Sequence, residues 1–241
     1  MKTGLFSALE RMNKVCHYHE WLFEQIGDRI DGDVIDIGSG WGDIVQFYRS
    51  AAIKSVVATD CAAQMQEILV KRFADQPQFS VQSCNILSAA DIARIGEGRF
   101  DTLTSVNVLE HIADDVTALV NMRRLLKPGG RLCLIVPALK WLYGSVDRVV
   151  GHERRYSRRN ILPKLAQAGF VQPQISYMNL LGTLTWFVMG RVIRRKDFPH
   201  RSSQALDRVV PFLRGMEKII PPPFGQSLVV FAQTERAKEK S

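Results

Sequence analysis

The sequence predicts an α/β fold built on a doubly wound sheet. Short apolar, β-branched segments alternate along the chain with segments of helical spacing, a pattern typical of parallel strands with helices on both faces. The first of these segments ends in a run of glycines, as expected where a strand turns toward a ligand. Seven strands are expected, at residues 33–37, 55–59, 79–83, 100–106, 131–136, 170–177 and 227–233.

The composition is typical of one globular domain. A chain of 241 residues with 46% hydrophobic content can bury a full core. Its four cysteines stand far apart and lack a metal-binding spacing, which indicates a reducing cytoplasm and predicts no metal site. The first fifteen residues have the spacing of an amphipathic helix, and their apolar run is too short and interrupted for a signal peptide.

Three glycines stand at alternate positions from Gly38 to Gly42, two residues after Asp36. This spacing differs from the dinucleotide fingerprint, because Asp43 replaces the small residue and would repel a pyrophosphate. The pattern suits a ligand that carries an amine and a carboxylate but no phosphate. Helical spacing from Trp41 onward predicts a helix directly after the turn. A tight turn without a ligand is the alternative.

Polar side chains follow the next two strands. Asp60 ends the second strand, where its carboxylate can accept two hydrogen bonds from a ribose diol, a group present in both NAD and S-adenosylmethionine. Asn85 follows the third strand, and its amide oxygen is a candidate partner for an adenine edge. An exposed loop asparagine is the alternative at that position.

These residues, together with "FDTLTSVNVLEH" (100–111) and "LLKPGGRLCLIVPA" (125–138), resemble the class I S-adenosylmethionine-dependent methyltransferases. The segment containing "GHERRY" (151–156) resembles a bacterial subgroup often associated with glycan and cell-envelope biosynthesis. The resemblance implies a seven-stranded, Rossmann-like sheet with an antiparallel last strand and a helical insertion before it.

The implied organisation is a single methyltransferase domain over residues 1–241. It comprises an N-terminal helical cap (1–30), a cofactor-binding core (31–178), a helical insertion or lid (179–226) and the last strand (227–235). The apolar start of the insertion, 180–196, is too short to span a bilayer. It is expected to act as a lid, a dimer contact or a helix lying at the membrane interface, and Pro211 is expected to kink or break its second helix.

The resemblance implies S-adenosylmethionine as cofactor and S-adenosylhomocysteine as product. Many members carry Asp where this chain has Asn85, whose amide oxygen can still accept from the adenine amino group. The residues expected to bind the cofactor are Asp36, Gly38, Ser39, Gly40, Gly42, Asp60, Cys61, Asn85, Ile86, Asn107 and Tyr18.

The candidate catalytic groups are two histidines, one after the fourth strand and one after the fifth. A sulfonium methyl is already activated, but a hydroxyl acceptor benefits from a base, for which His152 is the first candidate and His111 the second. The alternative is a structural His152 in a helix lead-in, with Tyr156 packing. Arg154, Arg155 and Tyr156 are expected to bind the substrate, the arginines through a carboxylate or phosphate.

The net charge of +8 favours an acidic acceptor, small or lipid-linked, with O-methylation preferred over N-methylation. Nucleic acid is less favoured, since the fourth strand is followed by "NVLE" rather than by a base-amino methyltransferase motif. A non-catalytic cofactor-binding module stays open, and the glycine spacing argues against an NAD-dependent oxidoreductase. The expected location is the cytoplasm, with contact at the inner membrane face as an option.

Overall fold

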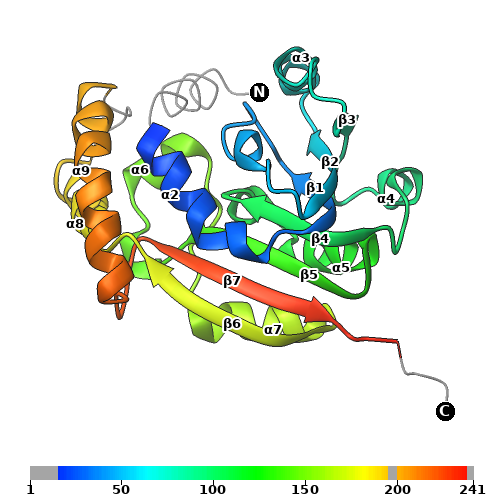
Figure 1. Cartoon of the computed structure of the whole chain (residues 1–241). Helices are drawn as coiled ribbons and strands as arrows, with labels where there is room; N and C mark the ends of the chain where they lie inside the picture. The colour runs from blue at the N-terminus through cyan, green and yellow to red at the C-terminus, as the bar shows by residue number, and fades with distance from the viewer. Residues whose placement is uncertain (1–15, 195–199, 238–241) are drawn as a thin grey trace.

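The structure, a computed structural model, describes residues 16–194 and 200–237, with the backbone alone over 200–206. The helix expected over the first fifteen residues lies outside this part. Seven strands form one mixed sheet (Figure 1). They are β1 (Gly32–Ile37), β2 (Ile53–Asp60), β3 (Phe79–Ser83), β4 (Phe100–Val106), β5 (Leu126–Pro137), β6 (Phe170–Met178) and β7 (Ser227–Thr234).

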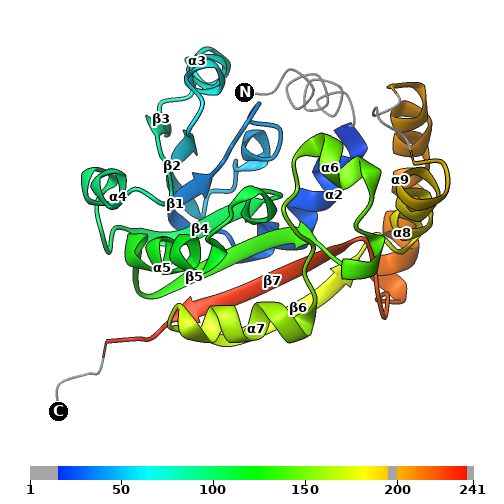
Figure 2. The same cartoon turned by 180° about the vertical axis from the view of Figure 1, so that it is seen from behind.

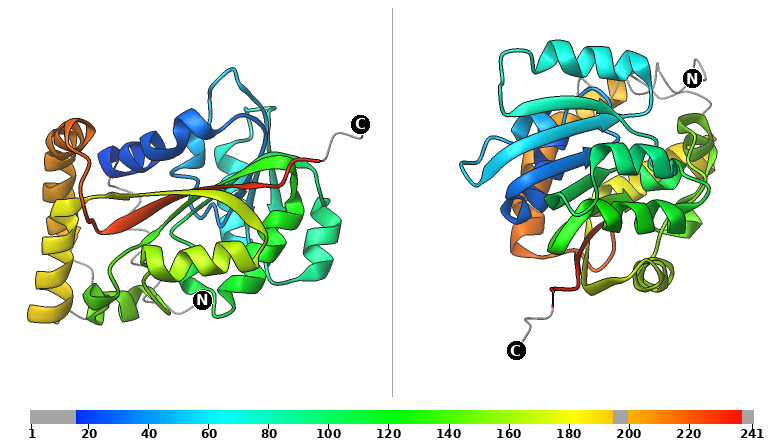
Figure 3. Two further views of the ribbon diagram at one scale, coloured as in Figure 1. Left: turned by 90° about the horizontal axis from the view of Figure 1, so that it is seen from below. Right: turned by 90° about the vertical axis from the view of Figure 1, so that its right-hand side faces the viewer.

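The strand order is β3-β2-β1-β4-β5-β7-β6. The first five strands are parallel, and β7 runs antiparallel to both neighbours, between β5 and β6 (Figure 3). Every expected strand is present, although β5 begins earlier than expected, at Leu126. The predicted doubly wound sheet with an antiparallel last strand is therefore confirmed.

Helices cover both faces of the sheet, as the alternating pattern predicts. On the face seen in Figure 2, α4, α5 and α7 contribute Ile92, Leu119 and Ile161 to the apolar core. On the other face, α2 and α3 bury Trp21 and Leu69. The α-helices are α2 (Cys16–Ile26), α3 (Ala63–Arg72), α4 (Ala89–Ile95), α5 (Asp115–Leu125), α6 (Ser145–Val150), α7 (Arg158–Gln167), α8 (Leu180–Phe187) and α9 (His200–Ile219).

The strand order places a ligand-binding position at the end of β1. This strand is buried by its aliphatic side chains and pairs with β2 on one edge and β4 on the other. Its register sets Asp36 opposite Ala58 of β2 and Thr104 of β4. The chain leaves β1 and β4 toward opposite edges of the sheet, so their carboxyl ends form a topological switch point, where such sheets bind ligands.

The helix expected directly after the glycine turn is a wrong prediction. No α-helix follows the glycine turn; the chain makes successive turns and one 3₁₀ turn, η2 (Val45–Phe47). Gly42 has φ +78°, which a right-handed helix cannot contain. Glu110 and His111 lie in another 3₁₀ turn, η3 (Leu109–His111), and α5 begins only afterwards, with Asp114 as its N-cap.

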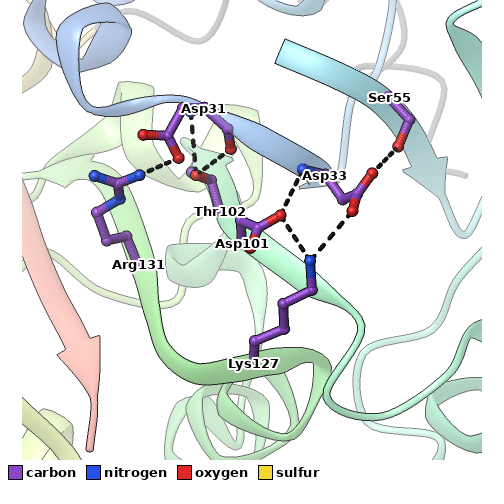
Figure 4. Close-up of polar contacts among 7 residues, drawn as sticks. All are labelled: Asp31, Asp33, Ser55, Asp101, Thr102, Lys127 and Arg131. Carbon is purple, nitrogen blue, oxygen red and sulfur yellow. Dashed lines mark hydrogen bonds and ion pairs between the residues drawn. The ribbon is translucent and has the colours of Figure 1, made fainter. Parts of the chain in front are cut away.

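Charge pairs close the amino-terminal edge of the sheet (Figure 4). Lys127 Nζ lies 2.7 Å from a carboxylate oxygen of Asp101 and 3.2 Å from one of Asp33. Arg131 pairs with Asp31 just before β1. These contacts join the starts of β1, β4 and β5, and the two cations offset the repulsion among the carboxylates. Each pair is partly exposed and adds little to stability by itself.

The expected insertion between β6 and β7 is helical. It consists of α8, a π-helical turn η5 (Val188–Val192) and α9, which stand together at one end of the sheet (Figures 1 and 3). Of the kink or break expected at Pro211, the break is absent, because α9 continues through this residue. Asn179 is the N-cap of α8, and Glu217 of α9 accepts from the N–H groups of Asn179 and Leu180. In the described part of the chain, no helix has the length and apolar character needed to cross a bilayer.

Candidate active site

The three glycines of the β1 turn all have positive φ, at +75°, +52° and +78° for Gly38, Gly40 and Gly42. A side chain on Gly38 would meet Val108 at 2.5 Å, and one on Gly42 would meet the Phe73 ring at 3.0 Å. A Cβ on Gly40 would meet nothing within 4 Å. Two of the glycines therefore permit close packing, while Gly40 presents bare backbone to open space.

That open space is a cleft at the carboxyl ends of β1 and β4. Its floor is the glycine turn, and α2 supplies one wall. The lining residues are His19, Leu22, Asp36, Gly38, Ser39, Gly40, Trp41, Asp43, Ile44, Val106 and Asn107. The cleft therefore occupies the switch point that the strand order defines.

Asp36 is the buried anion of this cleft. Its carboxylate accepts hydrogen bonds from the hydroxyls of Ser39 (2.7 Å), Tyr48 (3.3 Å) and Thr104. Burial raises the pKa of Asp36 to about 6, against the opposing effect of these three donors. A cationic group bound at the cleft would offset the cost of burying this charge.

Asp60 ties the end of β2 to the glycine turn. Its carboxylate accepts from the backbone N–H groups of Gly40 (3.1 Å) and Ala62 (2.9 Å). Burial raises the pKa of Asp60 in spite of these bonds. Each carboxylate oxygen has capacity for one further donor, which is the geometry needed to receive a diol.

Other residues expected at the cofactor lie farther from the glycine turn. Asn85 is exposed, and its amide oxygen accepts from the N–H of Leu87 in a local turn. Cys61 is exposed, whereas Ile86 is buried. Tyr18 is half-buried. Burial raises its pKa, while hydrogen bonds with Ser227 and Asn179 oppose this shift.

A second cluster of polar side chains follows β4 and β5, centred on His152. Its Nδ1 lies 2.9 Å from Asp147 Oδ1, and its Nε2 lies 3.6 Å from Glu110 Oε1. His111 packs edge-on against it, with ring centroids 5.0 Å apart, and directs Nδ1 at the carbonyl oxygen of Gly151 (3.0 Å). The structure thus brings together the two histidines that were expected to act as bases.

Burial shapes the charge state of this cluster. It raises the pKa of Glu110 to about 7, while His152 and Arg155 act in the opposite direction. Burial lowers the pKa of His111 to about 4, with the nearby His152 adding to the effect. The carboxyl of Glu110 and the imidazole of His111 thus both favour their neutral forms more than they do in water.

Asp147 holds the cluster in place. Its side chain is fully buried and also accepts from Arg155 Nε (2.7 Å), Trp186 Nε1 (3.1 Å) and the N–H of Gly144 (2.9 Å). Burial raises the pKa of Asp147, but His152 and Arg155 outweigh it and the net shift is downward. The Trp186 ring lies parallel to that of His152, with centroids 6.4 Å apart, so the insertion covers this cluster.

The structure places the polar groups of "RRY", the segment expected to bind the substrate, in contacts within the protein. Arg154 donates to the carbonyls of Ile112 and Ala113 and pairs with Asp115. The hydroxyl of buried Tyr156 also donates to Asp115. These polar groups are used inside the protein, where they fix the loop that carries His152.

Arg155 is likewise enclosed rather than presented to solvent. It is 2% exposed, donates Nη1 to the Ala138 carbonyl, and stacks its guanidinium on Trp186 at 4.9 Å from the ring centroid. The expectation of Tyr156 as a packing residue is met, because this residue is fully buried.

Sequence reasoning missed three residues of these sites. His19 lines the cleft from α2, next to Tyr18, but periodicity alone leaves the rotation of that helix undefined. Asp147 lies five residues before His152 and carried no motif of its own. In the sequence Trp186 is part of an apolar helix. Its hydrogen bond to Asp147, which is 39 residues away along the chain, is formed only in the folded protein.

Residues 35–132 match a protein family described as "Methyltransferase domain". A ubiquinone biosynthesis O-methyltransferase of Cereibacter sphaeroides is 34% identical over 139 residues, which cover 53% of this chain and 53% of that protein. A ubiquinone/menaquinone biosynthesis C-methyltransferase of Desulfotalea psychrophila is 33% identical over 158 residues, 61% of this chain and 62% of that protein.

The fold is also similar to those of solved methyltransferase structures. A crystal structure of a SAM-dependent methyltransferase from Thermotoga maritima superposes with a TM-score of 0.63 at 16% identity, covering 96% of this chain and 97% of that one. The chain spans only about half to three fifths of the curated relatives it matches. Residues 35–132 are thus similar in sequence to a methyltransferase domain, and the chain shares its fold with a SAM-dependent methyltransferase.

Proposed function

We propose that the protein transfers the methyl group of S-adenosylmethionine to a hydroxyl of a small-molecule, sugar or lipid-linked acceptor. The observation that carries the proposal is the open space over Gly40, in a cleft that a buried carboxylate lines. A cluster able to receive a proton lies in the segments that follow β4 and β5. The resemblance of the "GHERRY" segment favours an acceptor from glycan or cell-envelope biosynthesis. The product of the cofactor is S-adenosylhomocysteine.

In this proposal the cofactor lies along the ends of β1, β2 and β4. Asp36 binds its ammonium group and Asp60 its ribose diol, using the acceptor capacity that each carboxylate retains. Gly40 allows the ligand to contact the main chain. The remaining expected contacts, at Gly38, Ser39, Gly42, Cys61, Asn85, Ile86, Asn107 and Tyr18, are part of the same proposal.

His152 is the proposed acceptor of the hydroxyl proton, and His111 is the second candidate. Asp147 accepts from Nδ1 of His152, which leaves a lone pair on Nε2 on the side of Glu110. A carboxylate-oriented imidazole is the arrangement that general bases use. O-methylation is preferred over N-methylation because a neutral amine needs no such group.

The cluster also argues against a cofactor-binding module without catalysis. Such a module has no need for a buried Glu110 next to two histidines, since an uncompensated buried carboxyl lowers stability. Nucleic acid remains the less favoured acceptor, because the arginines beside His152 are engaged inside the protein.

The insertion is the proposed cover of the acceptor, and its outer face is a proposed contact with an anionic membrane. Seventeen large apolar side chains are exposed in the described part of the chain, and thirteen of them lie between residues 180 and 224. Exposed cations, including Arg191, Arg194 and Arg208, accompany them. This combination favours a lipid-linked acceptor at the cytoplasmic face of the inner membrane.

The first prediction separates a ligand-binding glycine from a turn-forming one. Gly40→Val should lower the affinity for S-adenosylhomocysteine at least about 100-fold, because the branched side chain would fill the cleft. Gly98→Val is the matched control: Gly98 also has positive φ and open space around its Cβ, but lies outside the cleft. Calorimetry on both folded variants measures the difference, and equal affinities would contradict the assignment.

The second prediction uses the raised pKa of Asp36. If the carboxylate binds the cofactor's ammonium group, the affinity for S-adenosylhomocysteine should stay constant from pH 8 to 7 and fall as Asp36 is protonated below about pH 6. At pH 5 it should be roughly tenfold weaker than at pH 7.5. Asp36→Asn should bind weakly with no such step. A wild-type profile parallel to that of the variant would count against this contact.

The third prediction tests the proton acceptor. His152→Ala should lower kcat roughly 10²–10⁴-fold while the affinity for S-adenosylhomocysteine stays nearly unchanged. His111→Ala should have the smaller effect. Single-turnover rates with a hydroxyl acceptor supply the measurement, and a near-wild-type rate for His152→Ala would transfer the role to His111.

The fourth prediction concerns the membrane. The full chain should float with vesicles containing anionic lipid and remain behind with neutral vesicles. Phe212→Glu, at a side chain 69% exposed on the insertion, should abolish flotation; Val70→Glu, at one 56% exposed on α3, should not. A stable dimer that Phe212→Glu dissociates, without vesicle binding by the wild type, would instead assign this face to a second copy.

A further inference from the structure

Three side chains with metal-ligating atoms converge beside the cofactor cleft. Glu110 and His111 come from η3, just after β4, and His152 comes from the loop after α6. One ligand atom from each lies within 4.8 Å of the others. We propose that these three residues bind a divalent transition-metal ion such as Co(II), Zn(II) or Fe(II). The ion's role in catalysis rests on the proposed function, whereas its binding does not.

Glu110 is the first indication of a missing partner. Its side chain is completely buried, and within the described residues neither carboxylate oxygen has a hydrogen-bond partner. The nearest polar contact is His152 Nε2, at 3.6 Å from Oε1. Buried carboxyl groups in folded proteins almost always have donors, because an unsatisfied one is costly. A cation between Glu110 and the two imidazoles would supply the missing interaction.

The hydrogen bonds of the histidines leave the correct atoms available. His111 directs Nδ1 at the carbonyl oxygen of Gly151, at 3.0 Å. A carbonyl oxygen can only accept, so Nδ1 carries the proton and Nε2 carries a lone pair. His152 has the same arrangement, with the carboxylate of Asp147 at 2.9 Å from Nδ1. Metal-binding histidines are oriented in this way by a carbonyl or carboxylate behind the ring.

The outer partners are themselves fixed. Asp147 accepts from Arg155 and from Trp186, and all of these side chains lie in a closely packed region. The Trp186 ring covers one face of His152. These contacts orient the imidazole, and small shifts of the three ligands would bring their donor atoms to bonding distance from a common centre.

The donor set favours a particular class of ion. Two imidazole nitrogens and one carboxylate oxygen suit Fe(II), Co(II) and Zn(II), whereas Mg(II) and Ca(II) prefer sites made of oxygen. Three protein ligands leave coordination positions for a substrate oxygen. Ligation of an acceptor hydroxyl would lower its pKa, so that its proton passes to water. The oxygen then forms the O–CH₃ bond as the S–CH₃ bond breaks, and S-adenosylhomocysteine is released.

In that form both histidines are ligands, and the hydroxyl loses its proton because it is bound to the ion. His152→Ala then slows the reaction for a different reason than loss of a base. The effect of a metal chelator on the rate of methyl transfer distinguishes the two mechanisms, since a base acts equally well when the metal has been removed.

The test is a Co(II) titration of the full chain after removal of metals, followed by visible absorption and equilibrium dialysis. We expect one Co(II) per chain with the absorption bands of a nitrogen-ligated ion. Glu110→Gln and His111→Asn should each weaken binding by at least about tenfold. His17→Asn is the matched control, because His17 Nδ1 also lies near a carboxylate, 3.0 Å from Asp207, but half-exposed and outside the cluster.

Glu110→Gln preserves shape and removes a buried charge, so its unfolding temperature should not fall. Three results would each overturn the metal site. The wild type would fail to bind Co(II), both cluster variants would bind it as tightly as the wild type, or His17→Asn would weaken binding as much as they do. S-adenosylhomocysteine should bind the metal-free chain with undiminished affinity. If the chain binds S-adenosylhomocysteine but no Co(II), the metal site is removed and the proposed methyl transfer is unaffected. If S-adenosylhomocysteine binds neither the metal-free nor the Co(II)-treated chain, the proposed function itself is overturned.

Discussion

The buried negative charge of Asp147 is the constraint on which the region beyond β5 depends. Its two oxygens receive donors from the start of α6, from the loop that carries His152, from Arg155 and from Trp186 in the insertion. A buried ion pair stabilises a fold only when its remaining lone pairs are also satisfied. Here a single carboxylate satisfies donors from several segments, so it fixes their relative positions and orients the imidazole in the same set of contacts.

The glycine turn shows how similar residues acquire different tasks. Gly38 and Gly42 are required because Val108 and Phe73 pack where a Cβ would lie, and Gly40 because the chain turns with positive φ beside an empty volume. Asp60 then accepts from the N–H of Gly40, so that the second strand holds the shape of the first turn. The cleft is therefore formed before any ligand enters, which reduces the ordering needed on binding.

Much of this architecture could be predicted from the sequence because its signals are local. Runs such as Val34-Ile35 identify buried strands, and the spacing of the glycines indicates a ligand rather than a simple loop. The helix expected after Trp41 was wrong because periodicity does not register the positive φ of Gly42. The pairing of Arg155 with Asp147 could not be predicted for a different reason: Asp147 is identified as its partner only by the folded contacts. Long-range pairing of this kind leaves no mark on periodicity or composition.

The order of the strands has a consequence for synthesis on the ribosome. β6 pairs with β7, and β7 also fills the place beside β5, although it follows the whole insertion in sequence. During translation β6 and the insertion emerge well before the strand that attaches them to the sheet. The helices of the insertion, with their exposed apolar side chains, must therefore remain in solution while the parallel part of the sheet is already able to form. During that interval a chaperone or a membrane surface would bind these helices.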